Sequence, residues 1–280
     1  MDLKEIISEV RHATGNRDRS PSTAEIRAMT KKVQKEAGDV RSVVDVLLND
    51  RSIGALKLAL SLLPTREDSY RQELGEIIDL SDNENWEIRE YAADALAMTL
   101  KVHFEELNGY LVELRSSSSE NVRRAVVVAL KYLGKERNVS RCEEILKILA
   151  EYMDDNSAYV QRNLGAFAVG DGLIEYCPHA SIAMLKKMAK SKSSIARWNV
   201  AMVFTAATGT NYFREMCDEL LALLRDPEPK VRSAALKAVR TVAQRHASSR
   251  SQIKKAIGDK GIQPLHTEKA IGSVLEACND

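Results

Sequence analysis

The chain has 280 residues, of which 41 are Lys or Arg and 40 are Asp or Glu, so its formal net charge at pH 7 is +1. This balance excludes a basic nucleic-acid arm and an acidic tail, so an anion-binding surface would need charge segregated between faces of the fold. No uncharged apolar run reaches the roughly 18 residues that span a membrane, and the acidic N-terminus lacks a signal-peptide core. We therefore expect a cytoplasmic protein without a membrane segment.

Helix caps and hydrophobic periodicity predict helices along the chain and require no strand. Hydrophobic residues make up 44% of the sequence and aromatic residues only 5%, which suits helix-on-helix packing. Ser140 and Glu143 have the spacing of a capping box. The predicted helices cover 2–13, 23–37, 39–49, 51–63, 66–80, 86–101, 104–115, 120–134, 140–153, 157–175, 179–191, 194–207, 211–225 and 228–246.

A repeated pattern organises these helices: an aliphatic anchor, usually an Arg one or two places later, then small and apolar residues at helical spacing. Successive anchors are 34 to 38 residues apart, which is the length of two helices and two turns. The anchors are Ile53, Ile88, Val122, Val160, Ile195 and Val231. This period predicts an all-α fold, a right-handed α-α superhelix of about six to seven helical hairpins.

We expect a single domain over 1–280, because a repeat array grows by stacking. Cap helices would occupy 1–50, repeats 51–246 and a C-terminal cap 247–280, with a degenerate seventh unit near Thr267. The basic stretch 248–260 is interpreted as a solvated capping helix, with an extension of a basic surface as the alternative.

The segment 223–232 matches the HEAT-repeat consensus, and the chain resembles that superfamily. In HEAT repeats an Asp and an Arg six places later, here Asp226 and Arg232, belong to a ladder of hydrogen-bonded pairs between neighbouring repeats. The resemblance implies this structural role also for Arg89 and Arg123, which have the same position. A direct contact with a ligand is the alternative.

Two further segments resemble the AlkD-like family of DNA alkylation repair proteins, a HEAT-like branch that includes DNA glycosylases. Residues 22–35 are similar to that family's N-terminal helix, with its Arg and spaced lysines. Residues 159–168 follow its fourth-repeat pattern of aliphatic, Gln, basic, two residues and Gly. With the matching repeat length, the resemblance covers about residues 20–246.

Active members of that family use a Trp, an Asp four residues later, an Arg in the next repeat and a second Trp in the repeat after. The resemblance implies that Trp86 lines the deoxyribose, that Glu90 stabilises positive charge developing on it, and that Arg124 holds a phosphate. An alkylated purine is cationic and leaves readily, so no strong acid is needed. However, Glu is longer than Asp, Ala166 occupies the second Trp position, and Trp198 lies one repeat further on at a different helical phase. The predicted catalytic site, Trp86 and Glu90, is therefore incomplete.

Positions two and six after each anchor share a helix face. They place Arg124, Arg162 and Arg197 in line across three consecutive repeats, with Arg123 beside the first. Because Arg binds phosphate bidentately, this line predicts a DNA-binding stripe. The alternative is a set of inter-repeat ion pairs with acids of adjacent turns, such as Asp154, Asp155 or Glu120.

The remaining residue types indicate no metal site and no cofactor. The five histidines are scattered, and no glycine-rich phosphate loop occurs. The cysteines are far apart and form no C-x-x-C pair, so we expect reduced thiols. They are Cys142, Cys177, Cys217 and Cys278.

The resemblance favours a monomeric DNA-binding protein of the alkylation repair type, which grips duplex DNA in the concave groove of its superhelix. If it is an enzyme, the implied activity is that of a weak DNA-3-methyladenine or 7-alkylguanine glycosylase. The alternative is a non-catalytic HEAT-repeat scaffold whose groove binds a protein partner. A concentration of basic side chains on the second-helix face would favour DNA.

Overall fold

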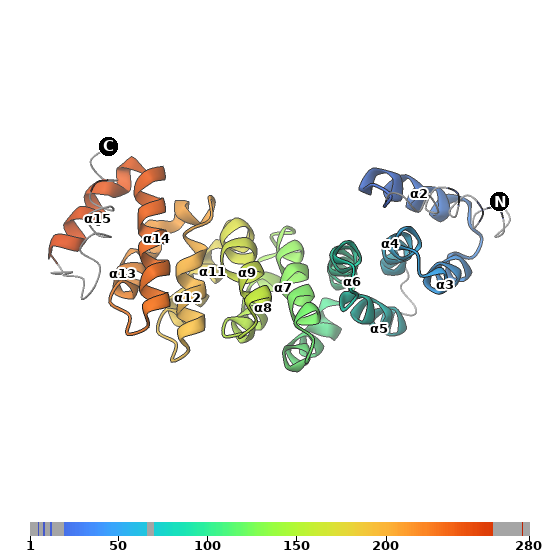
Figure 1. The fold of residues 1–280 in the computed structure, drawn as a ribbon, viewed down its shortest axis with the longest axis horizontal. Coiled ribbons are helices and arrows are strands. Elements are labelled where there is room, and N and C mark those ends of the chain that lie inside the picture. The colour runs from blue at the N-terminus through green and yellow to red at the C-terminus, as the bar shows by residue number, and fades with distance from the viewer. Residues whose placement is uncertain are drawn as a thin grey trace. The chain divides into compact units, whose positions relative to one another are not determined.

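The computed structural model of the chain describes residues 20–65 and 70–259, together with the single residues 5, 8, 12 and 276. Throughout these ranges the chain is helical and contains no β-strand (Figure 1), so the predicted all-α fold is confirmed. None of the described helices is long and apolar enough to cross a membrane. The predicted helix at 2–13 and the unit near Thr267 lie outside the described residues.

The chain forms two compact units. Residues up to Leu107 and Ser117–Ala129 make unit 1, while Asn108–Ser116 and the residues from Leu130 onward make unit 2. The superhelical hand and the single-domain organisation depend on how such units combine, and both stay predictions.

In unit 1, α4 packs against both α2 and α3, and most of its residues are buried. A capping box starts α2, with the Ser22 hydroxyl accepting the Glu25 N–H and the Glu25 carboxylate accepting the Ser22 N–H. The helices are α2 (Thr23–Glu36), α3 (Val40–Asp50), α4 (Ile53–Leu62), the 3-10 turn η1 (Leu63–Thr65), α5 (Tyr70–Ser81), the first part of α6 (Trp86–Glu113) and most of α7 (Glu120–Gly134).

The two helices predicted at 86–101 and 104–115 are joined as α6, which bends at His103, where the backbone leaves helical geometry. The remaining elements belong to unit 2. They are the 3-10 turn η2 (Leu114–Ser116), α8 (Val139–Tyr152), α9 (Ala158–Asn163), the π-helical η3 (Leu164–Leu173), α10 (Ile174–Tyr176), α11 (Pro178–Met188), α12 (Ser194–Val203), the 3-10 turn η4 (Gly209–Tyr212), α13 (Phe213–Leu223), α14 (Pro229–Arg245) and α15 (Ala247–Asp259).

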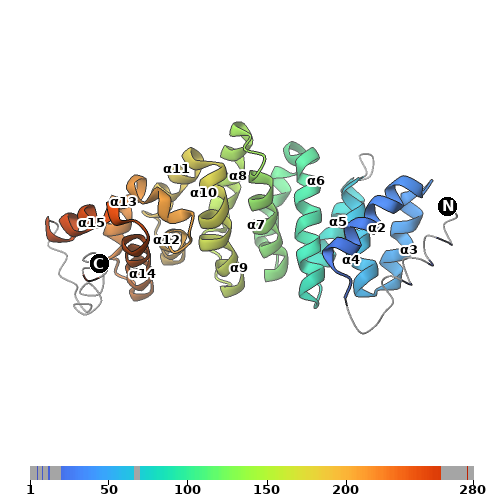
Figure 2. The same cartoon turned by 90° about the horizontal axis from the view of Figure 1, so that it is seen from above.

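Unit 2 is built in two layers. The first helices of its hairpins, α8, α11 and α13, pack in sequence on one side, and the second helices, α9 with η3, α12 and α14, pack in sequence on the other. Figure 2 shows these layers edge-on. The last described helix, α15, packs on α13 and α14 and buries Ile253 completely.

Two local predictions in unit 2 are wrong. Asn138, rather than Ser140, caps α8 by accepting the N–H of Arg141, because the helix begins earlier than predicted. The second helix predicted over 157–175 is α-helical only to Asn163 and continues as η3. Glycines let η3 approach α12 closely, since a Cβ at Gly165 would lie 2.8 Å from the carbonyl oxygen of Asn199.

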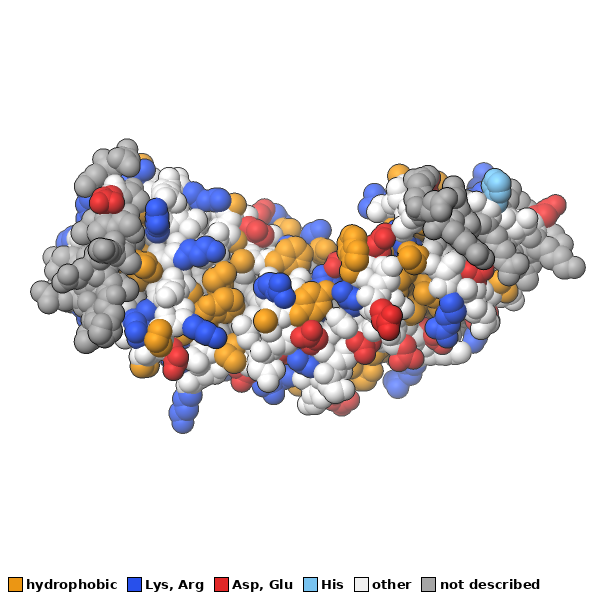
Figure 3. Space-filling view, in the orientation of Figure 1, with side chains coloured by type: hydrophobic (Ala, Val, Ile, Leu, Met, Phe, Trp, Pro, Cys, Tyr) orange, Lys and Arg blue, Asp and Glu red, His pale blue; other side chains and the backbone are white. Residues whose placement is uncertain are grey.

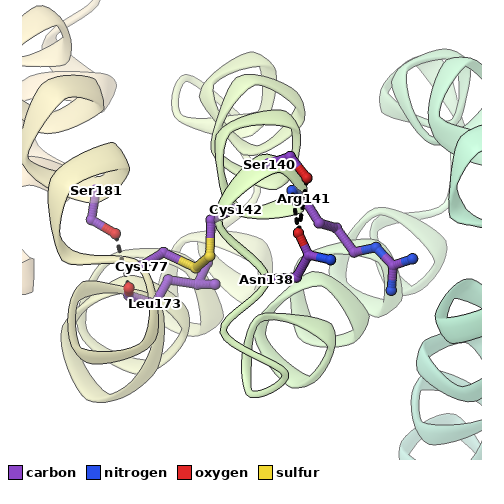
Figure 4. The surroundings of a disulfide bond; sticks show 7 residues. All are labelled: Asn138, Ser140, Arg141, Cys142, Leu173, Cys177 and Ser181. Atoms are coloured by element: carbon purple, nitrogen blue, oxygen red, sulfur yellow. Dashed lines mark hydrogen bonds between the residues drawn. A yellow bond between two sulfur atoms is a disulfide. The ribbon is translucent and has the colours of Figure 1, made fainter.

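Cys142 of α8 and Cys177, which precedes α11, form a disulfide with a Cα–Cα distance of 5.6 Å (Figure 4). The expectation of reduced thiols is therefore wrong for this pair. The two cysteines are 35 residues apart, which is one repeat period, so they occupy neighbouring places in successive hairpins. Cys217 is buried and lies outside the disulfide, and Cys278 lies outside the described residues.

Candidate nucleic-acid interface

The N-cap residues of the second helices define the register of the repeats. Five of the six caps accept a backbone N–H of the first turn, and the residue three places after each cap is at most 5% exposed. The caps are Ser52, Asn85, Ser119, Ser157, Ser193 and Glu228. The buried residues are Ala55, Ile88, Val122, Val160, Ala196 and Val231.

Two of the predicted anchors are therefore displaced. In α4 the buried position is Ala55 rather than Ile53, whose side chain is 37% exposed. In α12 it is Ala196 rather than Ile195. An alanine provides the buried contact in both helices, and a pattern that searches for a branched aliphatic residue passes over it.

The side chain four places after the cap holds the preceding turn in place. Arginines at this position donate from Nη1 to the backbone carbonyls five and six residues earlier, at 2.7 to 3.3 Å. They are Arg89, Arg123, Arg197 and Arg232. Two predicted DNA contacts, Arg123 and Arg197, thus make hydrogen bonds within the fold, to carbonyls of their own repeat.

Arg197 also forms a bidentate ion pair with Asp226 of the next repeat, Nε to Oδ2 at 2.5 Å and Nη2 to Oδ1 at 3.0 Å. The two side chains are only 13% and 4% exposed. Burial raises the pKa of the Asp226 carboxyl, but hydrogen bonds from Arg197 and the Glu228 N–H outweigh it, so the pKa lies below its usual value. The inter-repeat pairing expected of HEAT repeats is present here.

Replacing Asp226 by Asn is expected to lower the free energy of unfolding by about 2 kcal/mol at pH 7, because it leaves the Arg197 guanidinium poorly compensated. Since the folded-state pKa is depressed, this contribution is complete above the unfolded-state value of about 4 and is lost as the pH falls through the folded-state value. Urea unfolding at pH 7 and pH 3 measures it, with Asp79→Asn on exposed α5 as control. An Asp226→Asn effect of equal size at both pH values would contradict this account.

The residue five places after each cap lies on the helix face next to the buried face. This row of positions consists of Lys57, Glu90, Arg124, Arg162, Trp198 and Ser233. The predicted row was displaced by one residue in α12, where Ala201 is fully buried. Trp198 and Met202 take the places that had been assigned to Arg197 and Ala201.

Within unit 1, the structure brings two predicted site residues together. Arg124 donates from Nη2 to Oε1 of Glu90 in an ion pair that joins α7 to α6. The Arg124 side chain is 7% exposed and that of Glu90 is 36% exposed, so the carboxylate is the accessible partner. Trp86, one turn earlier on α6, is 64% exposed. This geometry makes Arg124 a support for Glu90 rather than a group that faces solvent.

A second buried ion pair fixes the start of α6. Lys57 is 2% exposed and donates from Nζ to Oε2 of Glu87 at 2.8 Å, and also to Ser20 and to the carbonyl of Pro21. The hydrogen bond from Lys57 lowers the pKa of Glu87, although burial opposes it. Sequence reasoning missed Lys57 because it took Ile53 as the anchor of α4. The buried residue is Ala55, and Lys57 lies two places after it, at the row position. The pair holds the turn that carries Trp86.

In unit 2, the predicted residue Arg162 is exposed and donates to the carbonyl of Ala158 on its own helix. Asp154, suggested as a partner for the arginine line, is paired with Arg115 at 2.7 Å instead. The guanidinium of Arg162 is thus placed at the surface of the second-helix layer. Ala166, one turn later, is half-buried.

Acidic side chains in unit 2 are distributed unevenly between the layers. The helices α9, α12 and α14 contain no Asp or Glu, and only Asp171 in η3 adds an acid to this layer. Their basic residues are Arg162, Arg197, Lys230, Arg232, Lys237, Arg240 and Arg245. The first helices α8 and α13 contain acids, Glu143, Glu144, Glu151, Glu215, Asp218 and Glu219, while the same layer also contains the bases Arg141, Lys147, Lys186, Lys187 and Arg214. Figure 3 shows basic side chains over the second-helix layer.

The fold and these side chains define the protein's class, a HEAT-like helical-repeat protein whose second helices carry the candidate interface. The chain belongs to the DNA alkylation repair enzyme family, which matches residues 19–168, more than half of its length. A HEAT repeat matches residues 216–246. The resemblances inferred from the sequence are thereby confirmed. No curated protein matches the chain.

Solved structures similar to this chain are also helical-repeat proteins. A HEAT-like repeats protein from the archaeon Thermococcus onnurineus NA1 has 13% identity over 86% of this chain and 96% of its own, with a TM-score of 0.44. A computationally designed armadillo repeat protein for modular peptide recognition has 17% identity over 85% of this chain and 99% of its own, with a TM-score of 0.42.

Proposed function

We propose that this protein binds duplex DNA along the second helices of its hairpins, in the concave groove expected of a superhelix. The absence of acids from three second helices of unit 2 carries the proposal: α9, α12 and α14 lack Asp and Glu and present Arg162, Lys237 and Arg240 to solvent. Phosphate contacts dominate DNA affinity, and a near-neutral protein can supply them only by gathering its basic groups on one face. Membership of the alkylation repair family supports DNA as the polyanion.

For the chemical step, we propose slow excision of cationic N3- or N7-alkylpurines at Trp86 and Glu90. As the glycosidic bond breaks, its electron pair leaves with the base, which departs neutral, and positive charge develops on the deoxyribose. The Glu90 carboxylate, held by Arg124, would stabilise that charge. A water molecule would then add to the anomeric carbon and lose a proton to solvent, which completes the hydrolysis. The longer side chain of Glu90 and Ala166 in place of a second Trp favour a low rate.

A protein-binding scaffold is the second candidate, and the exposed edge of α6 favours it. Met98 and Val102, one turn apart, are 49% and 58% exposed, and the exposed Asp94 lies one turn before Met98. Apolar and acidic side chains in one line suit a basic, amphipathic protein segment. Binding of a protein segment to α6 would not use the basic side chains on the second helices of unit 2.

Duplex DNA binding tests the proposal through two matched charge reversals. Lys237→Glu with Arg240→Glu alters the second-helix layer, whereas Lys186→Glu with Lys187→Glu alters exposed lysines of α11 in the first-helix layer. Both double variants have the same net charge. We expect the α14 pair to lose at least about tenfold in affinity, measured by fluorescence anisotropy at low salt, and the α11 pair to match wild type. No binding by the wild type, or equal losses in both, would favour the scaffold.

A further inference from the structure

A strip of partly exposed apolar side chains runs along α12 in unit 2. Ile195, Trp198 and Met202 are spaced by three and four residues, so they share one helix face. The core-facing side of α12 is separate, with Ala196, Val200 and Val203 at most 1% exposed. Each of the three side chains is partly buried, Met202 beside Gly165 of η3, and keeps part of its surface open to solvent.

Basic groups border this strip on both sides. Because α12 packs against η3 on one side and α14 on the other, its exposed face lies between the faces of these helices. Arg162 stands in the same row one repeat earlier, and Lys237 and Arg240 stand one repeat later. On the face drawn in Figure 3, hydrophobic side chains over α12 lie among basic ones.

The basic groups on α14 are available to an external anion. Lys230, Lys237 and Arg240 are exposed and share one face of the helix. Across the described ranges 20–65 and 70–259, no ion pair involves these three side chains. Uncompensated positive charge on one helix face attracts a polyanion such as a phosphate backbone.

We propose that α12 and its flanking basic groups bind an unpaired strand of nucleic acid. Bases would stack on Trp198 and contact Ile195 and Met202, while phosphates follow Arg162 on one side and Lys237 with Arg240 on the other. An aromatic platform inside a basic surface is the combination that binds single strands. A duplex keeps its base faces stacked inside, so its outer surface gives an apolar strip little to contact.

The inference rests on the proposed function and deepens it. Duplex DNA would be held by the whole second-helix layer, and an unpaired segment by α12 and α14. Neither α12 nor α14 lies within the family match over residues 19–168. The assignment therefore comes from the side chains of this chain.

Tryptophan fluorescence tests the inference directly, because the chain contains only Trp86 and Trp198. In a Trp86→Phe variant, emission reports on Trp198 alone. We expect oligo-dT of about 12 nucleotides to quench it at saturation, since a stacked base contacts the indole ring. The same titration with oligo-rU compares RNA with DNA. Binding of either strand supports the inference, and the strand that binds more tightly identifies the preferred sugar. Heparin, a polyanion without bases, is expected to bind without this quenching.

Affinity measurements supply an independent readout. Trp198→Ala is expected to weaken oligo-dT binding by about tenfold and to leave duplex affinity unchanged. Trp198→Phe, which preserves an aromatic face and serves as the folding control, is expected to retain most of the single-strand affinity. Single-strand binding without a change in Trp198 emission, or equal quenching by heparin, overturns the inference. If duplex binding persists in that case, the proposed function survives, whereas loss of both kinds of binding overturns both proposals.

Discussion

Replacing Glu90 by Gln is expected to slow the release of 7-methylguanine from alkylated duplex DNA by about 100-fold. The change removes the negative charge that would face the developing positive charge on the deoxyribose, and losses of this size accompany removal of one electrostatic stabiliser. Because Arg124 holds the carboxylate in place, the amide keeps the shape of the side chain and removes its charge. Release of free base under single-turnover conditions is the measurement.

Glu84→Gln provides the control, because Glu84 is exposed in the turn before α6 and lies outside the row. It removes the same charge from the same unit and is expected to leave release unchanged. Equal release by wild type and Glu90→Gln would remove Glu90 from the chemistry. Release at the spontaneous rate by every form, together with duplex binding, would identify a DNA-binding member that lacks excision.

A methyl group at Gly209 is expected to destabilise unit 2 by about 3 kcal/mol, because packing against backbone atoms leaves little room for relaxation. A Cβ there would lie 2.1 Å from the carbonyl oxygen of Val203 and 3.0 Å from its carbonyl carbon. The contact sets how closely η4 approaches the end of α12, the helix that carries Trp198. Thermal unfolding of Gly209→Ala measures the effect.

Gly109→Ala is the matched control. Gly109 is exposed on α6, and a Cβ there would meet nothing within 4 Å. Alanine at a helical position of this kind is expected to stabilise by up to about 1 kcal/mol, because it restricts the unfolded chain. Similar unfolding temperatures for the two variants would contradict the close packing of η4 on α12.

The helical layout follows from local signals, which the sequence contains in full. Periodic apolar positions placed α2 correctly, and the HEAT-like segment at 223–232 identified the turn between α13 and α14. Such features depend on interactions within a few residues, so they can be recognised without knowledge of the tertiary structure.

Register and pairing depend on tertiary contacts, and there the sequence was less informative. Ala196, rather than Ile195, is the buried residue at the start of α12, so Trp198 occupies the row position. Arg197 instead donates to the turn before α12. The signal available in the sequence was the spacing of four residues from the cap, which Arg197 shares with Arg89, Arg123 and Arg232. A cap-based alignment of the repeats would have recovered it.

Sequence reasoning identified both residues of the candidate catalytic pair but did not predict the ion pair between them. Glu90 and Arg124 were given separate roles, yet they occupy the same row position in successive repeats and form an ion pair. The disulfide follows the same logic, since Cys142 and Cys177 are separated by one repeat period. In a repeat protein, a separation of one period places side chains next to each other, and pairs at this spacing should be considered first.

The salt dependence of duplex DNA affinity tests most directly the claim that the second helices of unit 2 contact phosphates. If Arg162, Lys237 and Arg240 each contact one, the logarithm of the association constant should fall with the logarithm of salt concentration with a slope of about −3. The Lys237→Glu and Arg240→Glu double variant should have a slope shallower by about two units, and the Lys186→Glu and Lys187→Glu variant should retain the wild-type slope. A wild-type slope near zero, or the same change in both variants, would contradict the claim.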